Sequence, residues 1–266
     1  MIILLPTKIA QLTDMPRELR VRKLAHFFED AWALAMNGQA RVSVGLYCQR
    51  DWIPADKSCP MQNTAEALMD AGGLPVPIYL GGGEPAEQLS RVSALVLPGG
   101  QDIDPVLYGA FPEPGSPAEK LDGENDRFQK KCVLVATQMA LPMLGLGRGA
   151  RMLNLAHGGT LEQTVPPGHQ KDGPPAQASH AVGELAEGFQ VVGPAPDGTI
   201  ECIERKRPWA VGCEFYSESQ CPTDPAKASF FLRLVRRAER VVLPPGAPRV
   251  RVKVFRNPQS RFKRPI

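Results

Sequence analysis

The sequence lacks the features of membrane, metal-bound and disulfide-stapled proteins. No apolar stretch approaches the roughly 20 residues needed to cross a bilayer, and the N-terminal apolar run is too short for a signal-peptide core. The six cysteines form no CxxC pair and have no ligand spacing with the four histidines. Such cysteines are typical of reduced thiols in a cytoplasm. We therefore expect a cytoplasmic protein without a metal or another cofactor.

Acidic residues are missing from the C-terminal end. Residues 240–266 hold eight Lys or Arg and no Asp or Glu, which leaves 23 basic against 28 acidic groups, a net charge of −5, elsewhere. The stretch 249–254 alternates cations with valines, which predicts a strand. The cations that a partner could meet are Arg249, Arg251, Lys253, Arg256, Arg261, Lys263 and Arg264.

Three interpretations of this basic extension remain open. It could form a charge-protected edge strand, or add a strand to a partner protein or to a second copy of the chain. Nucleic-acid binding is the weaker third interpretation, because only Phe255 and Phe262 are available for stacking on bases.

The 266 residues suit one α/β domain with added ends. We expect an N-terminal strand and helix in 1–40, an α/β domain in 41–240 and the basic extension in 241–266. Short apolar runs alternate with helical periods in the centre, which predicts an open, mostly parallel sheet with helices on both faces, flavodoxin-like in the broad sense. The predicted strands are 41–47, 74–80, 94–97, 142–146, 200–205 and 210–215, and the predicted helices are 63–70, 126–139, 148–157 and 224–240.

The segment 144–154 predicts a strand that enters a sharp glycine-flanked turn and leaves as a helix. This is the geometry of a nucleophile elbow, which lifts one side chain above the sheet. At the helix N-terminus the dipole stabilises a thiolate or alkoxide. The residue at the apex of this turn is Gly147, which has no side chain to attack with.

Residues 144–164 resemble the elbow and following helix of class I glutamine amidotransferase-like hydrolases. The most similar branch is the γ-glutamyl-γ-aminobutyrate hydrolase type, with the pattern G-I-C-R-G-x-Q-x-L-N-V-A-x-G-G-T-L-x-Q. Gly147 stands at the cysteine position. The residues that match are Gly145, Arg148, Gly149, Leu153, Asn154, Ala156, Gly158, Gly159, Thr160, Leu161 and Gln163.

Two further segments carry the resemblance, in the family's order. Residues 97–105 resemble its oxyanion loop, L-P-G-G-x-D-V-D-P, which implies that backbone N–H groups at Gly100 and Arg148 would bind an oxyanion. Residues 212–218 resemble G-V-Q-W/F-H-P-E, but Tyr216 occupies the position of the histidine base, while Glu218, its orienting carboxylate, is retained. A phenol with a pKa of about 10 cannot deprotonate a thiol near pH 7.

Other residues keep alternatives open. Cys213 or Cys132 could act as a displaced nucleophile, although free cysteines are more often buried small hydrophobes. Gln101, Asp102 and His180 are candidates for a ligand pocket.

Structural roles are favoured over ligand binding or catalysis for four polar residues. We expect Asp102 and Asp104 to cap a turn rather than bind a ligand amine, and His157 to be a hydrogen-bonded structural group. Arg148 is expected to form a structural ion pair with Glu218 or with another carboxylate.

The loss of nucleophile and base predicts a catalytically inactive amidotransferase-like protein that works by binding or assembly, for example as a structural subunit. Its partner would be another protein or a second copy, met through the terminal extensions. The rival hypothesis is an active glutamine amidotransferase or γ-glutamyl amide hydrolase that uses a displaced nucleophile or a partner's residues.

Overall fold

The computed structural model describes residues 42–49, 60–112, 121–163, 180–194, 198, 200–214 and 225–241. The predicted N-terminal strand and helix lie outside the described residues. The strand predicted within the basic extension also lies outside them. Within the part of the chain that is described, no helix is long and apolar enough to span a membrane.

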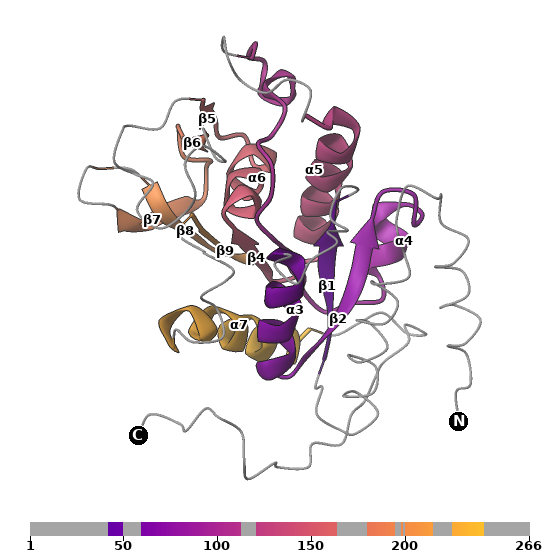
Figure 1. Cartoon of the computed structure of the whole chain (residues 1–266). Helices are drawn as coiled ribbons and strands as arrows, with labels where there is room; N and C mark the ends of the chain where they lie inside the picture. The colour runs from indigo at the N-terminus through magenta and orange to yellow at the C-terminus, as the bar shows by residue number, and fades with distance from the viewer. Residues whose placement is uncertain are drawn as a thin grey trace.

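A seven-stranded sheet forms the framework of the molecule (Figure 1). Its parallel part has the order β2-β1-β3-β4-β9, and β8 and β7 extend it with antiparallel pairing. The strands are β1 (Val42–Cys48), β2 (Gly73–Tyr79), β3 (Leu95–Leu97), β4 (Met143–Leu146), β7 (Phe189–Pro194), β8 (Ile200–Lys206) and β9 (Trp209–Cys213).

The parallel strands have the order of flavodoxin-like folds, with the direction of winding reversed between β1 and β3. In open α/β sheets of this kind, ligands bind outside the carboxyl ends of the strands at this switch point. The predicted mostly parallel, flavodoxin-like fold is therefore confirmed, and it indicates where a site would lie.

Helices cover both faces of the sheet (Figure 1). Helices α3 (Pro60–Asp70) and α7 (Pro225–Ala238) pack on one face, and α4 (Pro85–Leu89), α5 (Gly123–Gln138) and α6 (Arg148–Ala156) pack on the other. Because side chains alternate along a strand, β1 sends Val44 and Leu46 into the core under α3 and α7, and Tyr47 into the core under α5.

The predicted central strands and helices are present with ends shifted by a few residues. The sequence analysis missed α4, the 3₁₀ turn η1 (Pro105–Tyr108), the small sheet of β5 (Leu161–Glu162) with β6 (Ala181–Val182), and β7. These elements are short or lie at an edge of the sheet, where hydrophobic periodicity is weakest.

Candidate functional site

The turn from β4 into α6 has the backbone of a nucleophile elbow. Gly147 has φ 49° and ψ −115° and is the N-cap of α6. Its N–H donates to the carbonyl of Cys213 at the end of β9 (2.8 Å), and its carbonyl accepts from the N–H of Ala150 (2.8 Å). The elbow is therefore held by hydrogen bonds to its own helix and to the neighbouring strand.

The glycines around the elbow are required for different reasons. A Cβ on Gly149 would lie 1.9 Å from the carbonyl oxygen of Leu97, and one on Gly145 would lie 2.5 Å from the carbonyl oxygen of Gly149. A Cβ on Gly147 would find its nearest atom, the Cα of Gly99, at 3.7 Å, which is ordinary contact. Space therefore excludes side chains at the two flanking glycines but not at the apex, where only the positive φ favours glycine.

The oxyanion-loop segment lies against the elbow. The same 3.7 Å approach to Gly99 places the glycine pair after β3 beside the apex, and Gly100 has a positive φ of 148°. Asp104 caps η1 by accepting from the N–H of Val106 (3.0 Å), as predicted. The structure thus brings the two segments that carry the resemblance together in space.

Arg148, the first residue of α6, sends its side chain into the protein rather than into solvent. The side chain is 1% exposed, forms an ion pair with Asp126 of α5 and donates to Oε1 of Gln129. The second carboxylate oxygen of Asp126 accepts from the N–H of Asp104 (2.7 Å). The expected structural ion pair of Arg148 is confirmed with Asp126 as its partner, and it ties the elbow to α5 and to the oxyanion loop.

Burial opposes charge on both members of this pair. Burial raises the pKa of Asp126, although the Arg148 charge and the hydrogen bond from Asp104 lower it. Burial likewise lowers the pKa of Arg148, although Asp126 raises it. Each charge therefore depends on the other to remain in the protein interior.

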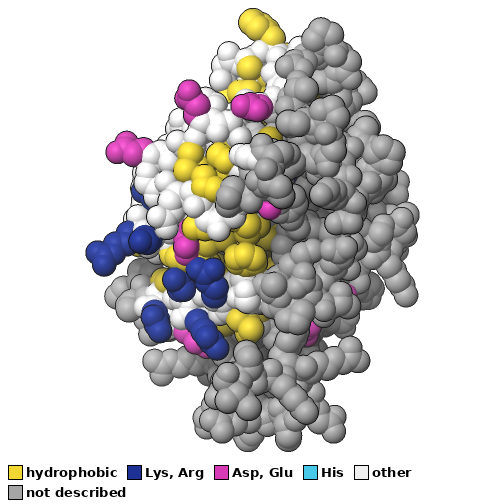
Figure 2. All heavy atoms as spheres, turned by 90° about the vertical axis from the view of Figure 1, so that its left-hand side faces the viewer, with side chains coloured by type: hydrophobic (Ala, Val, Ile, Leu, Met, Phe, Trp, Pro, Cys, Tyr) yellow, Lys and Arg dark blue, Asp and Glu magenta, His cyan; other side chains and the backbone are white. Residues whose placement is uncertain are grey.

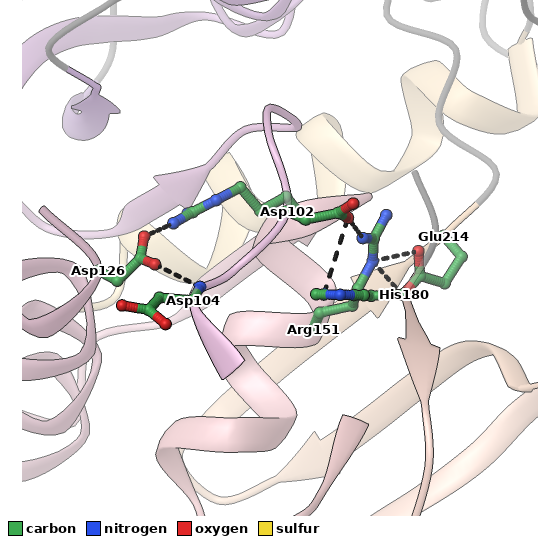
Figure 3. A network of polar contacts seen from close by, with 7 residues as sticks. Asp102, Asp104, Asp126, Arg151, His180 and Glu214 are labelled. Atoms are coloured by element: carbon green, nitrogen blue, oxygen red, sulfur yellow. Dashed lines mark hydrogen bonds and ion pairs between the residues drawn. The ribbon is translucent and has the colours of Figure 1, made fainter. Parts of the chain in front are cut away.

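Arg151, three residues further along α6, is the centre of a second buried network (Figure 3). Its Nη1 lies 2.9 Å from Oδ1 of Asp102, and its Nε donates to the two carboxylate oxygens of Glu214 (3.2 and 3.1 Å). Burial lowers the pKa of Arg151, but Glu214 and Asp102 raise it above its usual value. Nδ1 of His180 lies 3.8 Å from Oδ1 of Asp102, a contact that becomes an ion pair when the imidazole is protonated.

This network gives Asp102 an ion pair that was not expected and adds two residues that the sequence did not indicate. Asp102 was expected to cap a turn, and in the structure its carboxylate forms an ion pair with Arg151. Arg151 and Glu214 both stand where the family patterns above have Gln. The replacement of Gln at both positions was the sequence feature that could have indicated this ion pair. Neither replacement stands out alone, because 63 residues separate the two positions.

A small hollow lies at the switch point between β1 and β3. Its cavity of about 10 Å³ has room for roughly one water molecule. The structure brings the pocket candidates Gln101 and Asp102 together there, with His180 beside Asp102. The lining residues are Gln49, Gln101, Asp102, Asp122, Asn125, Asp126 and Arg148.

The remaining candidates have structural surroundings. Cys213 lies in the core under α3 and α7, and its pKa is raised by a hydrogen bond with Cys202 and by burial. Burial raises the pKa of Cys132 to about 12. His157 contacts the Leu153 carbonyl (2.8 Å) and the Thr137 hydroxyl (3.0 Å), and burial lowers its pKa.

Metal ligands do not gather in the described part of the chain. No group of three or more His, Cys, Asp or Glu that could hold a metal is present within the described ranges. Tyr216 and Glu218 lie outside the described residues. The Lys and Arg residues of 249–264 also lie outside the described residues.

A match to a protein-family model assigns the chain to a family. Residues 44–182 match the model described as Peptidase C26. The chain belongs to the Peptidase C26 family. This agrees with the resemblance to class I glutamine amidotransferase-like proteins.

Relatives of this Peptidase C26 chain carry amidotransferase names. A Mycobacterium tuberculosis protein named as a candidate glutamine amidotransferase is 30% identical over 146 residues, 44% of this chain and 47% of that protein. A Schizosaccharomyces pombe protein with the same description is 24% identical over 215 residues, 67% of this chain and 82% of the relative. This chain thus spans less than half of the bacterial relative.

A solved structure shares the fold. The crystal structure of a candidate GMP synthase subunit from Thermoplasma acidophilum superimposes with a TM-score of 0.51 at 14% identity. The match covers 74% of this Peptidase C26 chain and 94% of the other. At this identity the match supports the fold alone.

The two kinds of glycine at the elbow predict different costs for an added methyl group. Gly147→Ala should lower the free energy of unfolding by about 1–3 kcal/mol, because alanine is strained at positive φ. Gly149→Ala should cost at least about 3 kcal/mol, because its Cβ would overlap the Leu97 carbonyl and the helix would have to move. Urea unfolding followed by circular dichroism measures both; equal losses would contradict this distinction.

The Arg148–Asp126 pair predicts a large effect from removing one charge. Asp126→Asn should destabilise the protein by about 3–5 kcal/mol, because Arg148 would be left buried without a counter-charge. The matched control is Glu87→Gln, which removes the exposed pair with Arg91 and should cost less than about 1 kcal/mol. Asp126→Leu with Arg148→Met should recover most of the loss in urea unfolding. Similar costs for the two single changes would contradict a buried pair.

Proposed function

We propose that this chain is a catalytically inactive, γ-glutamyl hydrolase-like member of its family, and that it acts by binding or assembly as a structural subunit. The observation that carries this proposal is Gly147 at the apex of an intact elbow. Acyl transfer through a covalent intermediate requires an attacking atom at this apex. Glycine supplies only hydrogen.

The buried charges around the elbow support the same proposal. Arg151 lies in the first turn of α6 and is held by two carboxylates, Asp102 and Glu214, whose side chains are 12% and 14% exposed. Moving Arg151 to admit a substrate would leave those carboxylates without their cation, which is costly in a largely buried place. The network therefore favours a closed surface over an open substrate pocket.

The two candidate cysteines, Cys132 and Cys213, do not fit the role of a displaced nucleophile. A reactive thiol needs a lowered pKa and access to substrate. Cys132 and Cys213 are buried and have raised pKa values. A direct water attack would also lack the histidine base, whose position holds Tyr216.

We expect the purified full-length chain to release neither ammonia nor glutamate from glutamine or γ-glutamyl amides. Gly147→Cys alone should also be inactive, because Tyr216 cannot deprotonate the new thiol. A coupled glutamate assay and an ammonia assay measure both proteins. Turnover by the native chain that is lost in Cys213→Ala would establish the rival hypothesis of a displaced nucleophile. Substantial activity of Gly147→Cys would show that the role given to Tyr216 is wrong.

The charge distribution supports assembly through the C-terminal side. Helix α7, which precedes the basic extension in the sequence, carries arginines at 233, 236 and 237, a spacing that places them on one helix face, and Arg240 follows just after its end. The turn between β8 and β9 adds the exposed Lys206 and Arg207. Lys and Arg side chains gather on this side of the molecule (Figure 2). Because residues 1–239, this part of the surface included, carry a net charge of −5, the body of a second copy or an acidic protein would complement this surface.

Part of this basic surface is fixed in place. Arg233 and Arg237 lie over the ring of Trp209, at 5.4 and 4.3 Å from its centre, and Arg233 pairs with Glu204 (2.7 Å). Cations held over an aromatic face lose less freedom when they meet a partner. This preorganisation supports a protein interface rather than a merely solvated helix.

Removal of residues 242–266 tests the assembly proposal. The full chain should have a larger native mass than the truncated chain in light scattering, or should bind an acidic partner protein that the truncated chain does not bind. The association should weaken as salt is raised, because exposed charges are screened. An unchanged monomer for both chains, with no salt-dependent partner, would contradict assembly through this extension.

A further inference from the structure

β8 and β9 bring two cysteine side chains together beside the elbow. Cys202 of β8 stands opposite Cys213 of β9 in the antiparallel register, and their Sγ atoms are 2.7 Å apart. The sequence analysis treated the six cysteines as scattered thiols. The hairpin of β8 and β9 makes these two direct neighbours.

The register suits a disulfide. The N–H of Glu214 donates to the carbonyl of Glu201 (2.7 Å), so these two residues form a hydrogen-bonded pair. The next pair along, Cys202 and Cys213, is therefore of the non-hydrogen-bonded type. Such pairs have Cα atoms about 4.5 Å apart and closely spaced side chains, within the range of roughly 4.4–6.8 Å that disulfides span.

The two sulfurs differ in access and acidity. Cys202 is partly exposed, whereas Cys213 is buried. On the β7 side of Cys202 lies Gly193, where a Cβ would be 3.6 Å from the Cys202 sulfur, so no side chain at this position covers the sulfur. The hydrogen bond between the thiols lowers the pKa of Cys202 and, together with burial, raises that of Cys213. Cys202 is therefore the sulfur that reacts first with an external oxidant.

We propose that Cys202 and Cys213 form a site of reversible oxidation, which a small disulfide such as glutathione disulfide closes into a cross-strand bond. The Cys202 thiolate attacks one sulfur of glutathione disulfide, breaks its S–S bond and releases one glutathione thiolate. Cys213 then gives up its proton and attacks the Cys202 sulfur, which releases the second glutathione. Two electrons pass from the cysteine pair to glutathione disulfide, and an external dithiol reverses the exchange.

The bond would cross-link β8 to β9, the strand that supports the elbow. The Cys213 carbonyl accepts the N–H of Gly147 (2.8 Å), and the next residue, Glu214, holds Arg151. Oxidation therefore acts on the end of β9, which holds the elbow through this hydrogen bond to Gly147. The two cysteines lie outside the elbow, so their oxidation does not depend on whether the chain is an enzyme.

Peptide mapping of the full chain tests the proposal. Reduced protein is exposed to excess glutathione disulfide and then unfolded in denaturant with N-ethylmaleimide, which blocks the remaining thiols, buried ones included; a tryptic digest is analysed by mass spectrometry without reductant. The expected product is the Cys202 peptide joined to the Cys213 peptide, lost after treatment with dithiothreitol. Since the Cys213 tryptic peptide also contains Cys221, fragment ions or a Cys221→Ser chain assign the linked sulfur.

Substitutions provide the matched controls. Cys202→Ser and Cys213→Ser should each abolish the linked peptide, whereas Cys48→Ser, at another buried cysteine of the same core, should keep it. The proposal is overturned if both cysteines of the native chain remain open to N-ethylmaleimide after oxidation. It is also overturned if Cys202 retains glutathione without closing onto Cys213. Mapping the native chain gives this answer even where a substitution impairs folding.

Discussion

The close approach of the elbow to its two neighbouring strands is the constraint on which the site depends. A side chain on Gly149 would overlap the end of β3, and one on Gly212 of β9 would come within 2.9 Å of the Ala150 side chain. Because these glycines are fixed by packing, the elbow keeps its shape whatever stands at its apex. The backbone shape of the elbow in this chain is therefore independent of whether a catalytic side chain stands at its apex.

Two buried arginines near the start of α6 need counter-charges, and three carboxylates provide them. Arg148 and Arg151 both lie in the first turn of α6, where the helix dipole disfavours cations. They extend to different partners: Arg148 reaches Asp126 on α5, whereas Arg151 reaches Asp102 and Glu214 at the ends of β3 and β9. Each pair offsets the dipole as well as the guanidinium charge. Together they connect α6 to the segments on both of its sides, so the elbow is braced by charge as well as by backbone hydrogen bonds.

The sequence predicted what depends on local patterns. Buried apolar runs indicated β1, β3 and β4, and the glycine spacing indicated the elbow. Partners that come from distant segments could not be predicted in this way. Arg151 meets Asp102 across 49 residues and Glu214 across 63. Nothing in the local sequence around a charged residue states whether it will be buried, so the carboxylate partner of Arg148 was expected but its identity was not.

Glycine at the apex has an energetic consequence apart from the absence of an attacking atom at this position. A residue with a Cβ at φ 49° and ψ −115° is strained by about 1–3 kcal/mol, and an active hydrolase must bear that strain to present its nucleophile. Where no reaction is performed, nothing offsets the strain, and a change to glycine stabilises the fold without disturbing its neighbours. The flanking glycines cannot be replaced by residues with a side chain, because any side chain there would displace the helix. Under the proposed loss of activity, drift would alter the apex and preserve the glycines around it, which is the pattern that this elbow has.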